Sequence, residues 1–171
     1  MKDRAVLHLI LEGLFLAVAL PLFSAPAYGQ MDSYLGIGAG VFNVMDSNSG
    51  VYGLIDYRPP FGIYGIGTWI TLSATEDQAG YFSAGILKDF YLSKSFVLTP
   101  SFGIGIYNRA EEELVLGHPV EFRSALKLSY ELEDKSRIGV RFGHVSNADL
   151  GETNPGSEFL SLIYSIHFNS Q

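Results

Sequence analysis

Three residues near the C-terminal end of the sequence have side chains that can act together in ester hydrolysis. His144 and Ser146 are two positions apart, and Glu158 follows after a turn-rich segment. A serine hydroxyl becomes a nucleophile when a histidine accepts its proton, and a carboxylate can hold that histidine in the correct tautomer. These residue types indicate a serine hydrolase if the fold brings Glu158 next to His144.

The three residues also occupy unusual positions in the hydrophobic pattern. His144 and Ser146 are in phase with Phe142, and Glu158 is in phase with Leu160. Alternate residues of a strand point to the same face, so polar groups are expected on an apolar surface. Two readings remain open at this point. The residues are interfacial polar groups at strand ends, or they form a site that acts at a lipid surface.

Strand geometry sets the distances within such a site. His144 and Ser146 would lie about 6.5 to 7 Å apart along one strand, which an imidazole and a hydroxyl can bridge. Glu158, on the neighbouring antiparallel strand, could approach the other ring nitrogen. Asn147 directly follows the serine and could donate a hydrogen bond to an oxyanion. No clustered set of metal ligands is evident, so we expect neither a metal nor another cofactor.

The elements that must position these residues are strands. Large residues at Phe102, Ile104 and Ile106 alternate with Gly103 and Gly105, and this period of two recurs along the chain. The alternation predicts about eight strands, at residues 33–43, 49–58, 61–72, 80–92, 95–107, 119–132, 136–147 and 157–168.

The connections between these segments alternate in length. Tight turns at residues 59–60, 93–94 and 133–135 alternate with longer polar loops around Asp46, Thr75, Glu111 and Asn154. Short turns at one end, long loops at the other and strands of about ten residues are typical of a transmembrane β-barrel. We therefore predict an all-β fold: an eight-stranded antiparallel transmembrane β-barrel of the bacterial outer membrane.

The narrow interior of an eight-stranded barrel decides which phase faces outward. It has room only for side chains, so bulky apolar residues belong in lipid, whereas a soluble barrel has the opposite arrangement. We expect Phe102, Leu126 and Leu162 to face lipid, with Gly103 and the charged residues Glu121, Arg123, Lys127 and Glu131 inside. Aromatic residues near strand ends are expected in interfacial girdles: Tyr34, Tyr52, Tyr57, Tyr64, Trp69, Tyr91 and Tyr107.

The first residues have the composition of a secretory signal peptide. Two basic residues precede an apolar run over residues 5–23, and small residues follow. Cleavage after Gly29 is preferred over cleavage after Ala27, so residues 1–29 are expected to be removed on export through the periplasm and residues 30–171 to form the barrel. A retained N-terminal membrane helix is the alternative.

The expected mature domain of about 140 residues is acidic and lacks cysteine. The full sequence has a formal net charge of -7 at pH 7 and Cys 0. An acidic domain without a basic stripe argues against nucleic acid as a partner. Without cysteine, no disulfide framework holds this exported domain together.

The C-terminal part of the chain resembles the outer-membrane lipid A 3-O-deacylases of the PagL type. The resemblance rests on the string His144-Val145-Ser146-Asn147-Ala148, followed by Asn154, Gly156 and Glu158. It implies an eight-stranded barrel with its site at the outer leaflet. It also implies removal of the ester-linked 3-hydroxyacyl chain at position 3 of lipid A, without a metal.

The same resemblance implies a role for each residue of the site. Ser146 would be the nucleophile, His144 the general base and Glu158 the orienting carboxylate. Asn147 would serve the oxyanion, and Asn154 would shape the adjacent loop. One position departs from the family pattern, since Asp149 stands where glycine is often found.

The expected function is thus lipid A 3-O-deacylation, with lipid A of lipopolysaccharide as substrate and outer-membrane lipid as surroundings. Two alternatives remain open: a non-catalytic small barrel that anchors or adheres through its loops, and another lipid-modifying barrel such as an acyltransferase or a phospholipase. The sequence also leaves open whether two copies associate as a homodimer.

Overall fold

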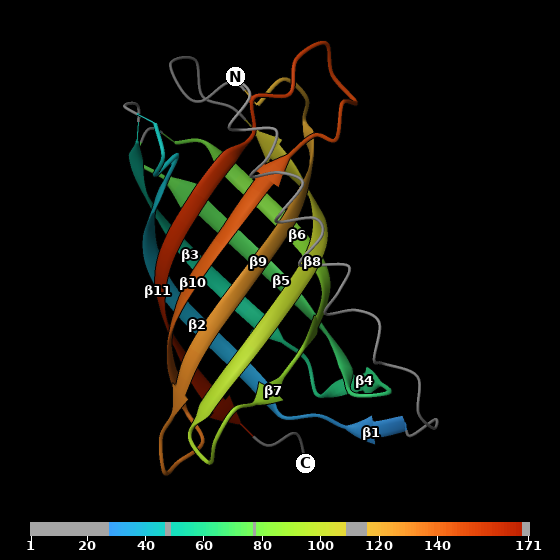
Figure 1. The fold of residues 1–171 in the computed structure, drawn as a ribbon, viewed down its shortest axis with the longest axis vertical. Helices are drawn as coiled ribbons and strands as arrows, with labels where there is room; N and C mark the ends of the chain where they lie inside the picture. Colours follow the sequence, from blue (N-terminus) through green and yellow to red (C-terminus); the bar gives the residue numbers. More distant parts are fainter. Residues whose placement is uncertain (1–27, 47–48, 77, 109–115, 169–171) are drawn as a thin grey trace.

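The computed structural model describes residues 28–46, 49–76, 78–108 and 116–168. Within them, eight long strands form a closed antiparallel barrel in which each strand pairs with the next, and the last pairs with the first (Figure 1). They are β2 (Ser33–Phe42), β3 (Gly50–Arg58), β5 (Ile66–Thr75), β6 (Gly80–Lys88), β8 (Phe96–Asn108), β9 (Val120–Glu131), β10 (Arg137–Ser146) and β11 (Ser157–Phe168). The predicted fold is confirmed.

The two ends of the barrel differ. At the lower end in Figure 1, β2 begins, β11 ends and the turn between β9 and β10 lies between Glu131 and Arg137. The loop between β10 and β11, residues 147–156, lies at the opposite end. His144, Ser146 and Glu158 therefore sit at the end away from both termini of the barrel.

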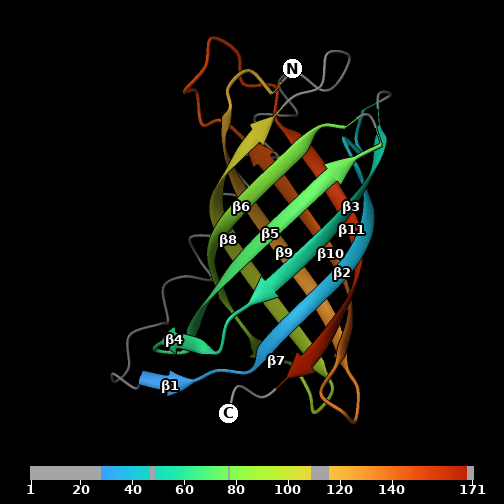
Figure 2. The same ribbon diagram turned by 180° about the vertical axis from the view of Figure 1, so that it is seen from behind.

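One predicted strand is divided by a turn that the alternation did not reveal. The segment 61–72 forms β4 (Phe61–Ile63) and then β5, because Tyr64 and Gly65 have φ angles of 55° and 72°. Two successive residues with positive φ make a tight hairpin of the kind that joins antiparallel strands. β4 also pairs with β1 (Tyr28–Gln30), and Figure 2 shows both beside the lower end of the barrel.

Two further expectations need small corrections. The predicted strand 80–92 ends at Lys88 and resumes as β7 (Phe90–Tyr91). Asp89, between the two strands, forms ion pairs with Arg58 and Arg137. The connection between β5 and β6, expected to be long, comprises only residues 76–79.

The outer surface carries the bulky apolar residues, as predicted. Leu126 is 44% exposed and Leu162 is 55% exposed, whereas Arg123 is 4% exposed. The same alternation runs through all eight barrel strands and makes a continuous apolar belt, which is the surface that a transmembrane barrel presents to lipid. The expected directions of Phe102 and Gly103 follow the same pattern.

The interior is filled with charged groups that pair across the barrel. Near the lower end, Arg137 lies 2.7 Å from both Asp89 and Glu131. Higher up, Arg141 pairs with Asp56. Asp89 and Asp56 come from segments distant in sequence from their arginines, whereas Glu131 lies directly opposite Arg137 on the adjacent β9. These carboxylates compensate the buried positive charges.

Several aromatic residues lie inside the barrel and not in the interfacial girdles where we expected them. Tyr34 and Trp69 are buried, and each ring contacts a guanidinium: Arg137 Cζ is 4.5 Å from the Tyr34 ring and Arg123 Cζ is 4.2 Å from the Trp69 ring. Cation–π contacts stabilise cations that have left water, which explains the inward direction. Tyr52 and Tyr107 also line an interior cavity, while Tyr57, Tyr64 and Tyr91 are exposed.

The expected signal peptide lies largely outside the described residues, as does the loop around Glu111. Of the expected segment 1–29, only Tyr28 and Gly29 are described, and a cut after Gly29 would divide β1. In the described part of the chain, no helix has the length and apolar character needed to cross a membrane.

Candidate active site

His144 and Glu158 form a direct cross-strand pair. The antiparallel register of β10 and β11 places the two residues opposite each other. His144 Nδ1 lies 3.3 Å from Glu158 Oε1. Both residues are in the outward phase of their strands, yet His144 is only 9% exposed. A carboxylate in this position can fix the tautomer of the imidazole and stabilise its protonated form.

Ser146 shares the face of the His144–Glu158 pair. It is the last residue of β10, two positions beyond His144, and it is half-buried. On the β9 side, Ser146 pairs with Phe122 and His144 pairs with Ser124. The sequence did not single out Ser124. Its small side chain next to the histidine interrupts the row of bulky residues along β9.

Gly156 completes the immediate surroundings of the histidine. It directly precedes β11 and has a φ of 65°, in the left-handed region that favours glycine. Its Cα lies so close to the His144 ring that a side chain there would meet the imidazole. The backbone thus approaches the histidine where any other residue would displace it.

Asn147 points into the barrel and organises the loop after the serine. It is 0% exposed, and its Nδ2 donates to the carbonyls of Leu116 at 2.7 Å and Thr153 at 2.8 Å. The Leu150 N–H donates to the Asn147 carbonyl. Because both carbonyls engage its amide nitrogen, Asn147 holds the β10–β11 loop against the segment at Leu116.

Asn154 and Asp149 extend this network. The Asn147 backbone N–H donates to Asn154 Oδ1 at 3.1 Å, and Asn154 Nδ2 donates to Asp149 Oδ1 at 3.2 Å. Asp149 has a φ of 62°, a conformation in which aspartate is enriched among non-glycine residues. Asp149 is therefore accommodated in this conformation, and its carboxylate accepts a hydrogen bond from Asn154.

The surface beside the polar group is apolar. Phe102 and Phe122 stack with ring centroids 6.4 Å apart and an interplanar angle of 18°. Leu160, the next outward residue after Glu158, is exposed. In the described residues, no group of three or more His, Cys, Asp or Glu side chains could hold a metal ion. The arrangement suits proton transfer to a histidine at a surface that contacts acyl chains.

Comparisons with known proteins identify a family that matches this chain. A family model described as lipid A 3-O-deacylase (PagL) matches residues 64–167. The lipid A deacylase PagL of Bordetella bronchiseptica (strain ATCC BAA-588 / NCTC 13252 / RB50) is 25% identical over 120 residues. That alignment covers 70% of this chain and 66% of the relative, just under two thirds of its length.

Solved structures share the barrel. The crystal structure of the outer membrane enzyme PagL superposes with a TM-score of 0.61 at 17% identity, covering 78% of this chain and 98% of that one. Neisserial surface protein A (NspA) gives a TM-score of 0.58 at 10% identity, covering 85% and 100%. At these identities the structures establish the fold alone. The family model spans more than half of the sequence, and the chain belongs to the family described as lipid A 3-O-deacylase (PagL).

Proposed function

We propose that this protein hydrolyses the ester-linked 3-hydroxyacyl chain at position 3 of lipid A, with Ser146 as nucleophile, His144 as general base and Glu158 as orienting carboxylate. One observation carries the assignment of residues. His144 Nδ1 lies 3.3 Å from Glu158 Oε1 on the outward face of the barrel. His144 is two positions before Ser146 on the same strand, so both share this face. Family membership supports the reaction, and this pair supports the assignment of the base and its orienting partner.

The reaction follows the sequence of a serine esterase. Ser146 Oγ attacks the ester carbonyl carbon while His144 accepts the hydroxyl proton. The bond between the ester carbonyl carbon and the sugar oxygen then breaks, and the imidazolium gives its proton to that oxygen, which leaves as a hydroxyl of lipid A. Water attacks the acyl-serine by the same route and releases a 3-hydroxy fatty acid. Glu158 remains a carboxylate and stabilises the imidazolium in both halves.

The position of the site fits a substrate in the outer leaflet. The three residues lie at the strand ends away from the barrel termini, next to the exposed Leu160. An ester bond of lipid A lies between the sugar head group and the acyl chains, so a site at this boundary meets it without extracting the lipid. We therefore propose lipopolysaccharide as substrate. We also propose that residues 1–29 are removed on export.

We assign Asn147 and Asn154 to positioning the loop beside the oxyanion. The Asn147 amide nitrogen is engaged by two carbonyls, and the Asn147 N–H is engaged by Asn154. An oxyanion donor from Asn147 would have to give up one of these bonds. The two residues together hold the chain that follows Ser146.

A passive barrel or a different lipid-modifying enzyme predicts other products. A passive barrel has no need for a His–Glu pair on its lipid-facing surface, where ionisable groups are costly. An acyltransferase would leave lipid A with an additional chain, and a phospholipase would act on glycerophospholipids. Mass spectrometry of lipid A and phospholipids from cells that express the protein distinguishes all three. Our proposal predicts loss of one 3-hydroxyacyl unit from lipid A and unchanged phospholipids.

A further inference from the structure

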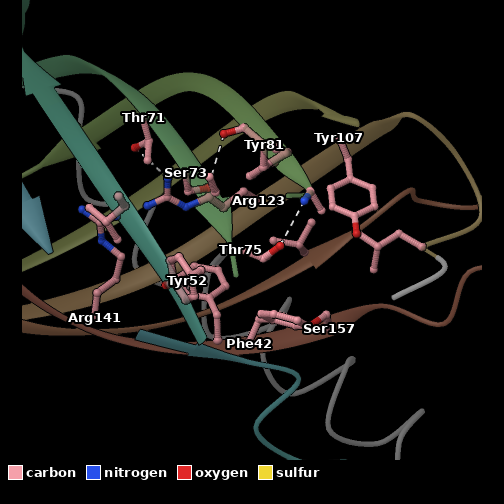
Figure 3. A pocket seen from close by; sticks show the side chains of 17 residues that line it. Phe42, Tyr52, Thr71, Ser73, Thr75, Tyr81, Tyr107, Arg123, Arg141 and Ser157 are labelled. Carbon is pink, nitrogen blue, oxygen red and sulfur yellow. Dashed lines mark hydrogen bonds between the residues drawn. The ribbon is translucent and has the colours of Figure 1, made fainter. Parts of the chain in front are cut away.

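A cavity of about 90 Å³ lies inside the outer half of the barrel, separate from the lipid-facing site. Figure 3 shows Arg123 and Arg141 reaching toward it beside Tyr52 and Tyr81. A water molecule needs about 10 to 15 Å³ of such space, so the cavity has room for several waters. It can therefore hold a short chain but not a lipid with several acyl chains.

The cavity has mainly apolar walls and two positively charged side chains. Among the described residues that line it, apolar and aromatic side chains predominate, including Leu54, Tyr52 and Phe159. Arg123 and Arg141 are the charged side chains in this lining, and no carboxylate belongs to it. A space with apolar walls and cationic groups is complementary to an anion that has an apolar tail.

Arg123 is the less satisfied of the two cations. Arg141 is paired directly with Asp56, whereas Arg123 forms no direct ion pair within the described part of the chain and reaches Asp56 only through Thr71. One carboxylate thus serves two cations. Arg123 Nη1 donates to Thr71 Oγ1 at 3.0 Å, while its buried Nε has no hydrogen-bond acceptor. The Trp69 and Phe159 rings flank the guanidinium at 4.2 and 5.4 Å. A buried cation of this kind is costly unless an anion binds it.

The cavity extends to the outer rim of the barrel. Thr75 at the end of β5 and Ala79 just before β6 line it, and the Ala79 N–H donates to Thr75 Oγ1. Val145 also lines it from between His144 and Ser146, pointing to the opposite face of β10. The cavity is therefore an interior site that lies back to back with the lipid-facing one.

We propose that this cavity binds a short- to medium-chain fatty carboxylate, with its carboxylate on Arg123 and Arg141 and its chain against the apolar walls. The two arginines share the single carboxylate of Asp56, and the excess positive charge selects the head group. The volume and the apolar lining select one acyl chain. This site is distinct from the proposed esterase site and does not depend on its assignment.

The single tryptophan provides a reporter for binding. The sequence has Trp 1, and the Trp69 ring lies 4.2 Å from the Arg123 guanidinium carbon. Full-length protein folded in a maltoside detergent is titrated with octanoate, octanol and acetate while Trp69 fluorescence is recorded. We expect a saturable response to octanoate. Octanol, which lacks the carboxylate, and acetate, which lacks the long chain, should bind at least roughly tenfold more weakly. Equal responses to octanoate and octanol would overturn the proposal.

Three variants localise the binding, and heat-modifiable migration on gels checks that each is folded. Arg123→Gln should weaken octanoate binding roughly ten- to hundredfold, the range expected for loss of a charge-assisted hydrogen bond. Because this change alters the indole surroundings, calorimetric titration replaces fluorescence for it. Ser73→Leu fills the cavity while keeping both cations and should also abolish binding.

Lys127→Gln is the matched control, because it removes a neighbouring interior cation that does not line the cavity. It should change octanoate affinity less than about threefold. If Ser73→Leu binds octanoate as tightly as the unmodified protein, the ligand lies elsewhere and the proposal fails. If Lys127→Gln weakens binding as much as Arg123→Gln, general interior charge and not this site is responsible.

Discussion

Gly156 lies against the His144 imidazole: a Cβ atom at residue 156 would be 2.7 Å from His144 Cε1 and 3.1 Å from Nε2. Gly156→Ala must therefore push the ring away from its position beside Glu158, and its φ of 65° adds backbone strain of about 1 kcal/mol. Misplacement of a catalytic group by about 1 Å costs roughly a hundredfold in rate. We expect a loss of ten- to a hundredfold in deacylation, measured on purified lipid A.

A second glycine gives the control for this change. A Cβ atom at Gly53, on β3, would have no neighbouring atom within 4 Å, and the φ of Gly53 is not positive. Gly53→Ala should leave the rate unchanged. Full activity of Gly156→Ala in a folded barrel would show that the exact position of the imidazole is unimportant.

The carboxylate of Glu158 should matter less than the nucleophile or the base. In serine hydrolases, removal of the orienting acid leaves more activity than removal of the other two groups. Glu158→Ala should retain measurable turnover, and Glu158→Gln should exceed it if the amide can still accept a bond from Nδ1–H. Initial rates on lipid A compare the two variants. If Glu158→Ala is as inactive as Ser146→Ala, the carboxylate does more than orient the ring.

Asn147→Ala should lower activity by loosening the loop that follows the serine. The change removes the bonds to the carbonyls of Leu116 and Thr153 and leaves both carbonyls buried, at a cost of about 1 to 3 kcal/mol. We expect faster protease cleavage within residues 147–156 together with slower deacylation. Slower deacylation with an unchanged cleavage rate would instead assign Asn147 to the oxyanion.

Single cysteines test the outward and inward phases, because the sequence has Cys 0. Leu126→Cys should react with a lipid-soluble thiol reagent, since Leu126 belongs to the exposed phase of β9. Ser83→Cys, at a fully buried interior position, is the control and should not react with it. The labelled fraction is read by mass spectrometry of the intact protein in vesicles. Reaction at residue 83 but not at 126 would reverse the assigned orientation.

The strands could be predicted from the sequence because one physical rule governs them. A barrel of this size must place bulky residues in lipid and small or charged residues inside, so alternation marks each strand and its facing. The rule does not report local backbone angles. It therefore missed the turn at Tyr64 and Gly65, where both φ angles are positive.

The interior was harder to predict because its contacts run across the barrel. Glu121 and Arg123, both expected inside the barrel, have different surroundings: the Glu121 carboxylate has no hydrogen-bond partner among the described residues, and Arg123 donates to Thr71 on β5. Trp69 was predicted to lie in an interfacial girdle, but its ring contacts the guanidinium of Arg123 inside the barrel. These contacts form only when the sheet closes into a barrel, so the residue pattern of a single strand does not predict them.

The proximity of His144 and Glu158 could be predicted because strand register alone brings them together. Residues of one strand that share a phase share a face, and a short turn-rich segment returns the chain as the neighbouring strand. This placed Glu158 opposite His144. The inward direction of Asn147 is consistent with its sharing the phase of Val145, but its loop contacts required the three-dimensional structure.

The central claim is that Ser146 is the nucleophile that trims lipid A. The most direct test is mass spectrometry of lipid A from cells that express Ser146→Ala, compared with the unmodified protein and with His144→Ala at equal amounts of folded barrel. Loss of the nucleophile or the base costs on the order of a millionfold in serine hydrolases. We predict that the unmodified protein removes one 3-hydroxyacyl unit and that both variants leave lipid A intact. Trimming by Ser146→Ala at the unmodified rate would contradict the assignment.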